Sequence, residues 1–218
     1  MQFNRNRVLI LLVILLAVIG AVVWYFAFFS IEEEASTNNA KNSISIEQPE
    51  KKDDNEFATL KGDDFDEAFV AGMIAHHDGA INMAERSMAY TAHKEIRTLS
   101  WDIIQTQSKE MIQMRNWQKE WGFKITNTGG HLSHSGGGEK MAGDMVEMTN
   151  KLVDLKGDDF DKEFLTQMIL HHEQAIEMAQ YAEQNAKRQE VKDIASDIMT
   201  AQDVEIAQMK RWQQDWGY

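Results

Sequence analysis

The sequence predicts an all-α protein in which an N-terminal transmembrane helix precedes a four-helix bundle made of two repeated helical hairpins. Three observations support this fold class: an uncharged N-terminal segment, helical spacing of apolar residues, and an internal repeat. The repeat aligns residues 60–123 with residues 155–218 at a constant offset of 95, without a gap and with 27 identities in 64 positions. A unit repeated only twice favours a symmetrical pair over a solenoid.

The N-terminal segment at residues 8–29 carries no charge over 22 residues. This length can cross a hydrocarbon core of about 30 Å at about 1.5 Å per residue. Arg5 and Arg7 precede it and three glutamates follow, so the positive-inside rule places the N-terminus in the cytoplasm. The stretch is longer than a signal peptide's apolar region and lacks a small-residue cleavage site. We therefore expect residues 1–30 to be an uncleaved single-pass anchor in the cell membrane, with the C-terminal domain extracytoplasmic.

Residues 31–56 form the next unit, an acidic, polar stretch that includes the only proline, Pro49. Its composition predicts a flexible spacer. The net charge of the whole chain is -13, which argues against nucleic-acid binding because phosphate contact needs clustered Lys and Arg. The chain has no cysteine, which excludes disulfides and thiolate ligands, so any soft metal ligand must be methionine.

The two hairpins are expected at residues 57–123 and 154–218. Each contains the sequence Gly-Asp-Asp-Phe-Asp, at residues 62–66 and 157–161, whose carboxylates are a helix N-cap signal before an apolar run. A second helix is expected at residues 94–121, and its counterpart at residues 190–216. Because neither hairpin can bury its apolar face alone, the two should pack together with pseudo-two-fold symmetry.

Residues 124–153, between the hairpins, combine a Gly- and His-rich loop with a short Met-rich helix. His131 and His134 lie among glycines, which favours a mobile connector and leaves a cation-binding loop as the alternative. Met141, Met145 and Met148 form one stripe at i, i+4 and i+7. Core packing is the default interpretation of that stripe, and soft-metal binding is the alternative.

Adjacent histidines occupy the centre of each repeat and lie on the apolar face of the predicted first helix. At about 100° per residue, Met73, both histidines and Met83 share one face. Burying two imidazoles side by side without a partner is costly, so a metal site is favoured over a purely structural role. The candidate ligands are His76, His77, His171, His172, Met73, Met83, Met168, Met178, Met114 and Met209.

The predicted second helices also carry an inward stripe, and it ends in tryptophans. Packing is the main alternative for Met114 and Met209, and the tryptophans are expected to be structural anchors. The first stripe is Ile103, Gln107, Glu110, Met111, Met114, Trp117 and Trp121. The second is Ile198, Gln202, Glu205, Ile206, Met209, Trp212 and Trp216. The repeat alone is compatible with one shared metal site or with two.

The ligand types indicate the metal. Thioethers prefer Cu(I), whereas imidazole accepts Cu(I), Cu(II) and Zn(II). Copper, as Cu(I) or Cu(II) or both, is therefore the expected metal, and other divalent metals stay open. Because imidazole binds metal only when neutral, the affinity should fall as the histidines protonate.

The repeated motifs resemble the uncharacterised domain family numbered 305. They are Met-Ile-x-His-His-x-x-Ala-Ile-x-Met-Ala at residues 73–84 and 168–179, and Gln-x-x-Glu-x-x-Gln-Met-x-x-Trp at residues 107–117 and 202–212. The resemblance implies a ferritin-like bundle and a copper-handling role, as in extracytoplasmic copper-binding members concerned with copper resistance. It assigns that role to Met73, His76, His77 and Met83 and to their counterparts Met168, His171, His172 and Met178. Family members often have a more Met-rich loop than residues 126–140.

The predicted function is a membrane-anchored extracytoplasmic protein that buffers or sequesters copper, or passes it to a copper pump or oxidase. One alternative is an enzyme, a ferritin-like oxidase acting on Cu(I) or carrying two metal ions. Dinuclear iron bundles use Glu-x-x-His motifs, yet the histidine helices contain none and only Glu110 and Glu205 lie on the facing stripes. The other alternative is a metal-free interaction module that docks on a membrane partner.

Overall fold

The computed structural model of the chain describes residues 55–125 and 138–218. Within these ranges the regular structure is helical, and no strand is present. None of the helices in the described ranges is long and apolar enough to cross a membrane. The expected anchor at residues 8–29, nearly all of the spacer, and the loop with His131 and His134 lie outside the described residues.

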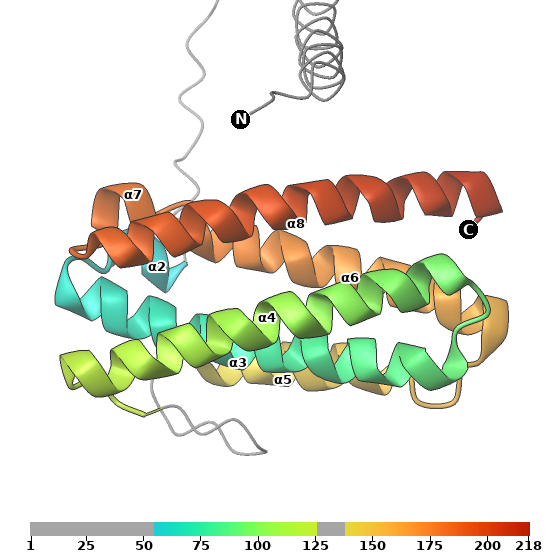
Figure 1. Ribbon diagram of the computed structural model, residues 1–218, viewed down its shortest axis with the longest axis horizontal. Helices are drawn as coiled ribbons and strands as arrows, with labels where there is room; N and C mark the ends of the chain where they lie inside the picture. The colour runs from blue at the N-terminus through green and yellow to red at the C-terminus, as the bar shows by residue number, and fades with distance from the viewer. Residues whose placement is uncertain (1–54, 126–137) are drawn as a thin grey trace, which may run out of the picture. The chain divides into compact units, whose positions relative to one another are not determined.

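Four long helices form two hairpins that pack together as a helical bundle (Figure 1). They are α3 (Asp63–Tyr90), α4 (Lys94–Trp121), α6 (Gly157–Ala179) and α8 (Gln189–Trp216). α3 packs along α4, α6 packs along α8, and α3 also packs against α6. The predicted all-α class is confirmed, and the bounds of α4 and α8 agree with the expected second helices to within one residue.

Three shorter helices complete the described part of the chain: α2 (Glu56–Thr59), α5 (Gly138–Asn150) and α7 (Ala182–Asn185). α5 packs against α3. Arg86 of α3 fixes the segment after α5, because its Nε donates a hydrogen bond to the carbonyl of Leu152 at 2.9 Å. α6 ends earlier than its counterpart α3, although Gln180 and Tyr181 keep right-handed helical dihedrals before α7 begins.

Both second helices end in the same way, at a tryptophan followed by a glycine. Gly122 and Gly217 have φ values of 73° and 75°, a left-handed conformation that glycine adopts without the strain a Cβ would cause. The following residues, Phe123 and Tyr218, donate backbone hydrogen bonds to the carbonyls of Gln118 at 2.9 Å and Gln213 at 2.8 Å. The repeated Trp-Gly-aromatic sequence therefore terminates each hairpin.

The acidic helix starts are located where the sequence predicted, but their carboxylates do not cap their own helices. The N-cap residues of α3 and α6 are Gly62 and Lys156, and neither makes a side-chain capping bond. Asp66 and Asp161, one turn into these helices, are fully buried instead. The capping prediction is wrong because these carboxylates bind the turn of the opposite hairpin.

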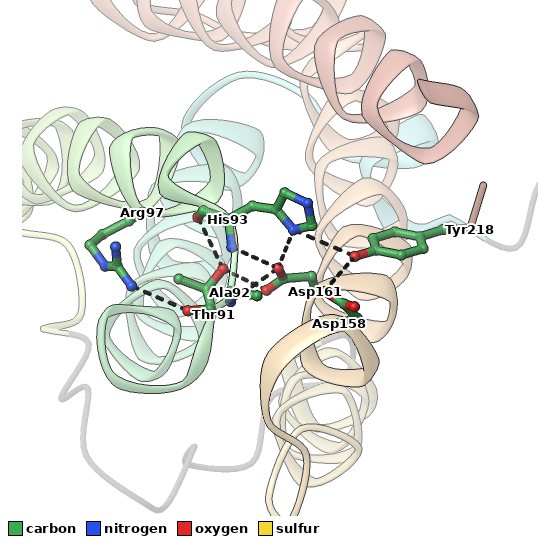
Figure 2. Close-up of polar contacts among 7 residues, drawn as sticks. All are labelled: Thr91, Ala92, His93, Arg97, Asp158, Asp161 and Tyr218. Atoms are coloured by element: carbon green, nitrogen blue, oxygen red, sulfur yellow. Dashed lines mark hydrogen bonds and ion pairs between the residues drawn. The ribbon is translucent and has the colours of Figure 1, made fainter. Parts of the chain in front are cut away.

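We call each of these contacts a turn clamp. The Asp161 carboxylate accepts hydrogen bonds from the backbone N–H groups of Ala92 and His93, at 3.1 and 3.0 Å (Figure 2). In the other clamp, Asp66 accepts from the N–H groups of Lys187 and Arg188, at 3.0 and 3.2 Å. Each partner differs from its counterpart by the repeat offset of 95, so the two hairpins hold each other reciprocally.

The core consists of two apolar clusters with stacked phenylalanines in each. The Phe65–Phe69 rings lie 5.8 Å apart and the Phe160–Phe164 rings 5.9 Å apart, and each buried ring stabilises the fold by about 1.5–3 kcal/mol. The first cluster includes Phe57, Phe65, Phe69, Met73, Met111, Met114 and Met178. The second includes Phe160, Phe164, Met83, Met145, Met148, Met168 and Met209.

Candidate metal centre

The four motif histidines lie inside the bundle, and the two repeats bring them to one place. All four have 0% of their surface exposed. The rings of His76 and His171 are in contact, with centroids 3.7 Å apart. The ring centroid of His77 lies 6.5 Å from that of His76, and the ring centroid of His172 lies 6.2 Å from that of His171. The histidine pairs therefore form one cluster, which we call the histidine centre.

A carboxylate from the second helix of each hairpin contacts the outer histidine of the pair. His77 Nε2 lies 2.7 Å from Glu110 Oε2, and His172 Nε2 lies 2.6 Å from Glu205 Oε2. Both carboxylates are partly exposed, and each accepts a hydrogen bond from the ring N–H of its histidine. When Nε2 carries the hydrogen, the lone pair of a neutral imidazole is on Nδ1. This is the arrangement in which a carboxylate orients a metal-binding histidine.

Six nitrogens of the histidine centre are buried without a hydrogen-bond partner: both ring nitrogens of His76 and His171, and Nδ1 of His77 and His172. Buried polar atoms in folded proteins are nearly always paired, and leaving one unpaired costs about 1–3 kcal/mol. A metal ion is a partner that would satisfy several of these nitrogens together. The donor set therefore fits a metal that accepts imidazole.

Burial lowers the pKa of His76 and His171 well below its usual value, and the neighbouring histidines lower it further. A second positive charge beside the first would be unfavourable, so the two contacting rings stay neutral at neutral pH. Neutral imidazole is the form that binds a metal ion. His76 and His171 are therefore held in the protonation state that binds a metal ion.

The six candidate methionines are all buried, and they are divided equally between the two apolar clusters. Met73 and Met114 of the first hairpin share the first cluster with Met178 of the second hairpin. Their counterparts Met168 and Met209 share the second cluster with Met83. Each cluster therefore joins thioethers from both hairpins, while the same side chains also fill the core.

Met145 of α5, which lies outside the repeats, packs against Gly79 next to the histidine centre. A Cβ built on Gly79 would lie 2.9 Å from Met145 Sδ and 3.2 Å from His171 Nε2. Met148, on the same stripe, is buried in the second apolar cluster, and the side chain of Met141 lies outside the described residues. The helical spacing of the three methionines did not distinguish among them.

The tryptophans occupy structural positions at the ends of α4 and α8. Trp117 stacks on Trp121 at 5.1 Å, and Trp212 stacks on Trp216 at 5.5 Å. Trp117 is buried, whereas the other three are only partly buried, so the inward stripe loosens towards the helix ends. This arrangement agrees with their interpretation as packing anchors.

One further group within the described ranges, His93, Asp158 and Asp161, places its ligand atoms within 4.8 Å of one another (Figure 2). However, Asp161 is already engaged by the turn clamp and by His93 Nδ1 at 2.7 Å. In the other clamp, the position of His93 is taken by Arg188, whose guanidinium bonds Asp66 at 2.8 Å. The group is therefore a structural clamp in which imidazole replaces guanidinium.

Several solved structures resemble the chain. CopM in its Cu(I)-bound form is 32% identical, with a TM-score of 0.57, over 69% of this chain and 96% of CopM. CopM in its Cu(II)-bound form is 31% identical, with a TM-score of 0.59, over 72% of this chain and 99% of CopM. CopM has also been solved with Ag bound.

A secreted DUF305 protein from Streptomyces coelicolor shares the fold, at 24% identity and a TM-score of 0.60 over 70% of this chain and 93% of that protein. No curated protein matches the chain significantly. The family model described as a domain of unknown function, DUF305, matches residues 30–117 and 66–213. Since these matches together span most of the sequence, the chain belongs to the DUF305 family.

Proposed function

We propose that this protein binds copper at the histidine centre. The observation that carries the proposal is the set of six buried imidazole nitrogens without hydrogen-bond partners. Four imidazoles with 0% exposure would be a net destabilising feature of the metal-free fold. Binding of an ion offsets that penalty, because the ion stabilises the native state and not the unfolded chain.

The choice of copper rests on the donor atoms and on the CopM relatives. The centre offers imidazole nitrogens, the six candidate methionines are buried in the two apolar clusters, and the chain has no thiolate. Imidazole and thioether together suit copper in both of its oxidation states, since thioether favours Cu(I). The structures of CopM with Cu(I), Cu(II) and Ag bound support the same assignment by similarity.

The proposed ligands are the four histidines, with the six candidate methionines as soft donors around them. His76 and His171 offer either ring nitrogen, and His77 and His172 offer Nδ1. Glu110 and Glu205 orient the outer rings from the opposite nitrogen. Met73, Met83, Met114, Met168, Met178 and Met209 are the thioethers.

In the cell, we propose that the protein buffers or sequesters copper outside the cytoplasm, or hands it to a copper pump or oxidase. Residues 1–30 would tether it to the membrane by a single helix, and the bundle would be of the ferritin-like kind. The charge asymmetry around residues 8–29 and the acidic composition of residues 31–56 support this placement.

The test is an anaerobic titration of the purified full-length chain with Cu(I), Cu(II) and Zn(II), compared with a variant in which His76, His77, His171 and His172 are replaced by Ala. We expect the variant to lose most tight copper binding. In the parent, copper at about 100 times its dissociation constant should add about 2.7 kcal/mol to the free energy of unfolding. Metal should not stabilise the variant. Copper affinity unchanged by the four substitutions would contradict the assignment.

A second variant distinguishes a loss of copper binding from a loss of folding. Replacing only His76 and His171 with Leu removes the contacting pair and leaves the orienting carboxylates with their histidines. Circular dichroism should report an unchanged helix content, because an apolar side chain of similar size replaces an unsatisfied polar one. Loss of the helical fold in both variants would instead indicate that the histidines are structural.

A further inference from the structure

The surroundings of the histidine centre are less symmetrical than the repeat that builds it. α5 lies between the two repeats in the sequence and has no counterpart in either. It packs against α3, where Gly79 allows close approach. The helix on one side of the centre is therefore an addition to the duplicated framework.

Gly79 lies beside two side chains, those of Met145 and His171. A Cβ there would be 2.9 Å from Met145 Sδ, 3.1 Å from Met145 Cγ and 3.2 Å from His171 Nε2. These separations are shorter than ordinary contacts, so a methyl group would displace the sulfur or the ring. The sulfur and the imidazole nitrogen therefore both lie against the bare face of Gly79.

The nitrogen at this point has no hydrogen-bond partner. His171 Nε2 is buried and unpaired, and Met145 is 7% exposed. A thioether is a weak hydrogen-bond acceptor and cannot replace the donor or acceptor that imidazole needs. An ion that binds both sulfur and nitrogen would satisfy the pair.

The counterpart of Gly79 in the second repeat is Gln174, whose side-chain oxygen is also buried without a hydrogen-bond partner. By the repeat relation, Gln174 stands to His76 as Gly79 stands to His171. Next to His171, Gly79 therefore leaves space for the thioether of Met145. At the equivalent position next to His76, the amide side chain of Gln174 takes the place of the glycine.

We propose that Met145 Sδ and His171 Nε2 bind one Cu(I) ion together, which makes the copper site asymmetric and selects the reduced ion on the α5 side. The inference rests on the proposed copper-binding function and adds a ligand from outside the repeated motif. Thioether sulfur binds without losing a proton and favours Cu(I) over Cu(II). Gly79 is required because it leaves room for the two donors to meet.

The structure positions Met145 for this role through the anchorage of α5. Arg86 donates to the carbonyl of Leu152 at 2.9 Å, which ties the end of the α5 segment to α3. The hydroxyl of Thr149 donates to the carbonyl of Met145 at 3.0 Å within the helix. The thioether is therefore presented from an ordered helix rather than from a loop.

One matched position separates metal binding from packing. Met148 lies one turn further along α5 with the same 7% exposure as Met145, and it packs in the second apolar cluster. Met148 therefore provides the control variant.

The test compares the full-length chain with Met145→Leu and Met148→Leu, two nearly volume-conserving changes. Cu(I) affinity is measured under anaerobic conditions by competition with a chromogenic Cu(I) chelator, and Cu(II) affinity by a separate competition. We expect Met145→Leu to weaken Cu(I) binding by roughly tenfold or more and Cu(II) binding by less than about twofold. Met148→Leu should leave both affinities unchanged.

The proposal is overturned if the parent binds Cu(I) tightly and Met145→Leu binds it equally well, or if Met148→Leu weakens binding to the same extent. If the parent binds no copper, the proposed function fails first. Copper X-ray absorption gives an independent measurement, because the sulfur contribution should decrease in Met145→Leu and not in Met148→Leu. Gly79→Ala should also weaken Cu(I) binding.

Discussion

Glu110 and Glu205 are partly exposed, and each contacts an outer histidine of the histidine centre. Each accepts the Nε2 hydrogen of an outer histidine, which raises the basicity of Nδ1 and fixes its orientation. Replacing both glutamates with Gln should weaken copper binding by about 10–100-fold, since a neutral amide does neither as well. Chelator competition measures this affinity.

The matched control for this pair is Glu120→Gln, an exposed position on α4 that lies ten residues beyond Glu110. It should leave copper affinity unchanged. If the double glutamate variant binds copper with the same affinity as the parent, the carboxylates do not contribute to copper binding.

The two contacting histidines also predict how stability depends on pH. Burial lowers the pKa of His76 and His171 well below the unfolded value of about 6.5. The native state keeps both rings neutral while the unfolded chain binds protons, so the free energy of unfolding falls as the pH decreases below about 6.5. The loss should be about 1.4 kcal/mol per pH unit for each histidine, until the lowered pKa is reached.

Urea unfolding of the metal-free chain between pH 8 and pH 5 measures this dependence. The variant with His76→Leu and His171→Leu should show a flatter profile over the same range, because the two titrating groups are gone. Equal slopes in parent and variant would mean that other groups control the acid destabilisation.

The sequence located the metal-binding candidates at residue level by helical periodicity, but not their partners. The period placed Glu110 and Glu205 on inward stripes, and the structure adds that each touches a histidine 33 residues away. A contact between different helices depends on their packing and leaves no local pattern. For the same reason, nothing in the spacing of Met141, Met145 and Met148 singled out the middle residue.

At the scale of the elements, the turn clamps predict where the hairpins hold each other. Replacing Asp161 with Ala should destabilise the bundle by about 1–3 kcal/mol, because the backbone N–H groups of Ala92 and His93 lose their acceptor. Asp66→Ala should have a similar effect at the opposite turn. Denaturant midpoints of the two variants measure the loss.

The control for the clamps is Asp159→Ala, in the first turn of α6 and exposed. This change should cost no more than about 0.3–1 kcal/mol, the magnitude of a charge at a helix N-terminus. If Asp159→Ala and Asp161→Ala are equally destabilising, the clamp contributes nothing beyond helix electrostatics.

The elements themselves were largely predictable, because apolar periodicity and the Gly-containing ends are local features. Trp121 and Trp216 end their helices as expected. The role of Asp66 and Asp161 was not predictable, since a carboxylate near a helix start has the same sequence signature whether it caps its own helix or binds a distant turn. The early end of α6 at Ala179 has no proline or glycine to announce it.

At the scale of the whole molecule, the proposed membrane orientation has its own test. Arg5 and Arg7 precede the uncharged segment and acidic residues follow it, so the C-terminal domain should face outward. Trypsin added to intact cells should cut the spacer near Lys51 and Lys52 and release the bundle. Protection of the domain under conditions that digest known surface proteins would contradict this orientation.

The contact between His76 and His171 joins a residue to its own counterpart, as happens close to the axis of a two-fold arrangement. An ion bound there would have ligands from both hairpins and would link them directly. All four imidazoles have 0% exposure, so an ion reaches them only when side chains or hairpins move apart. Loading and release of copper should therefore be slow, with rates set by the opening of the bundle rather than by encounter with the ion.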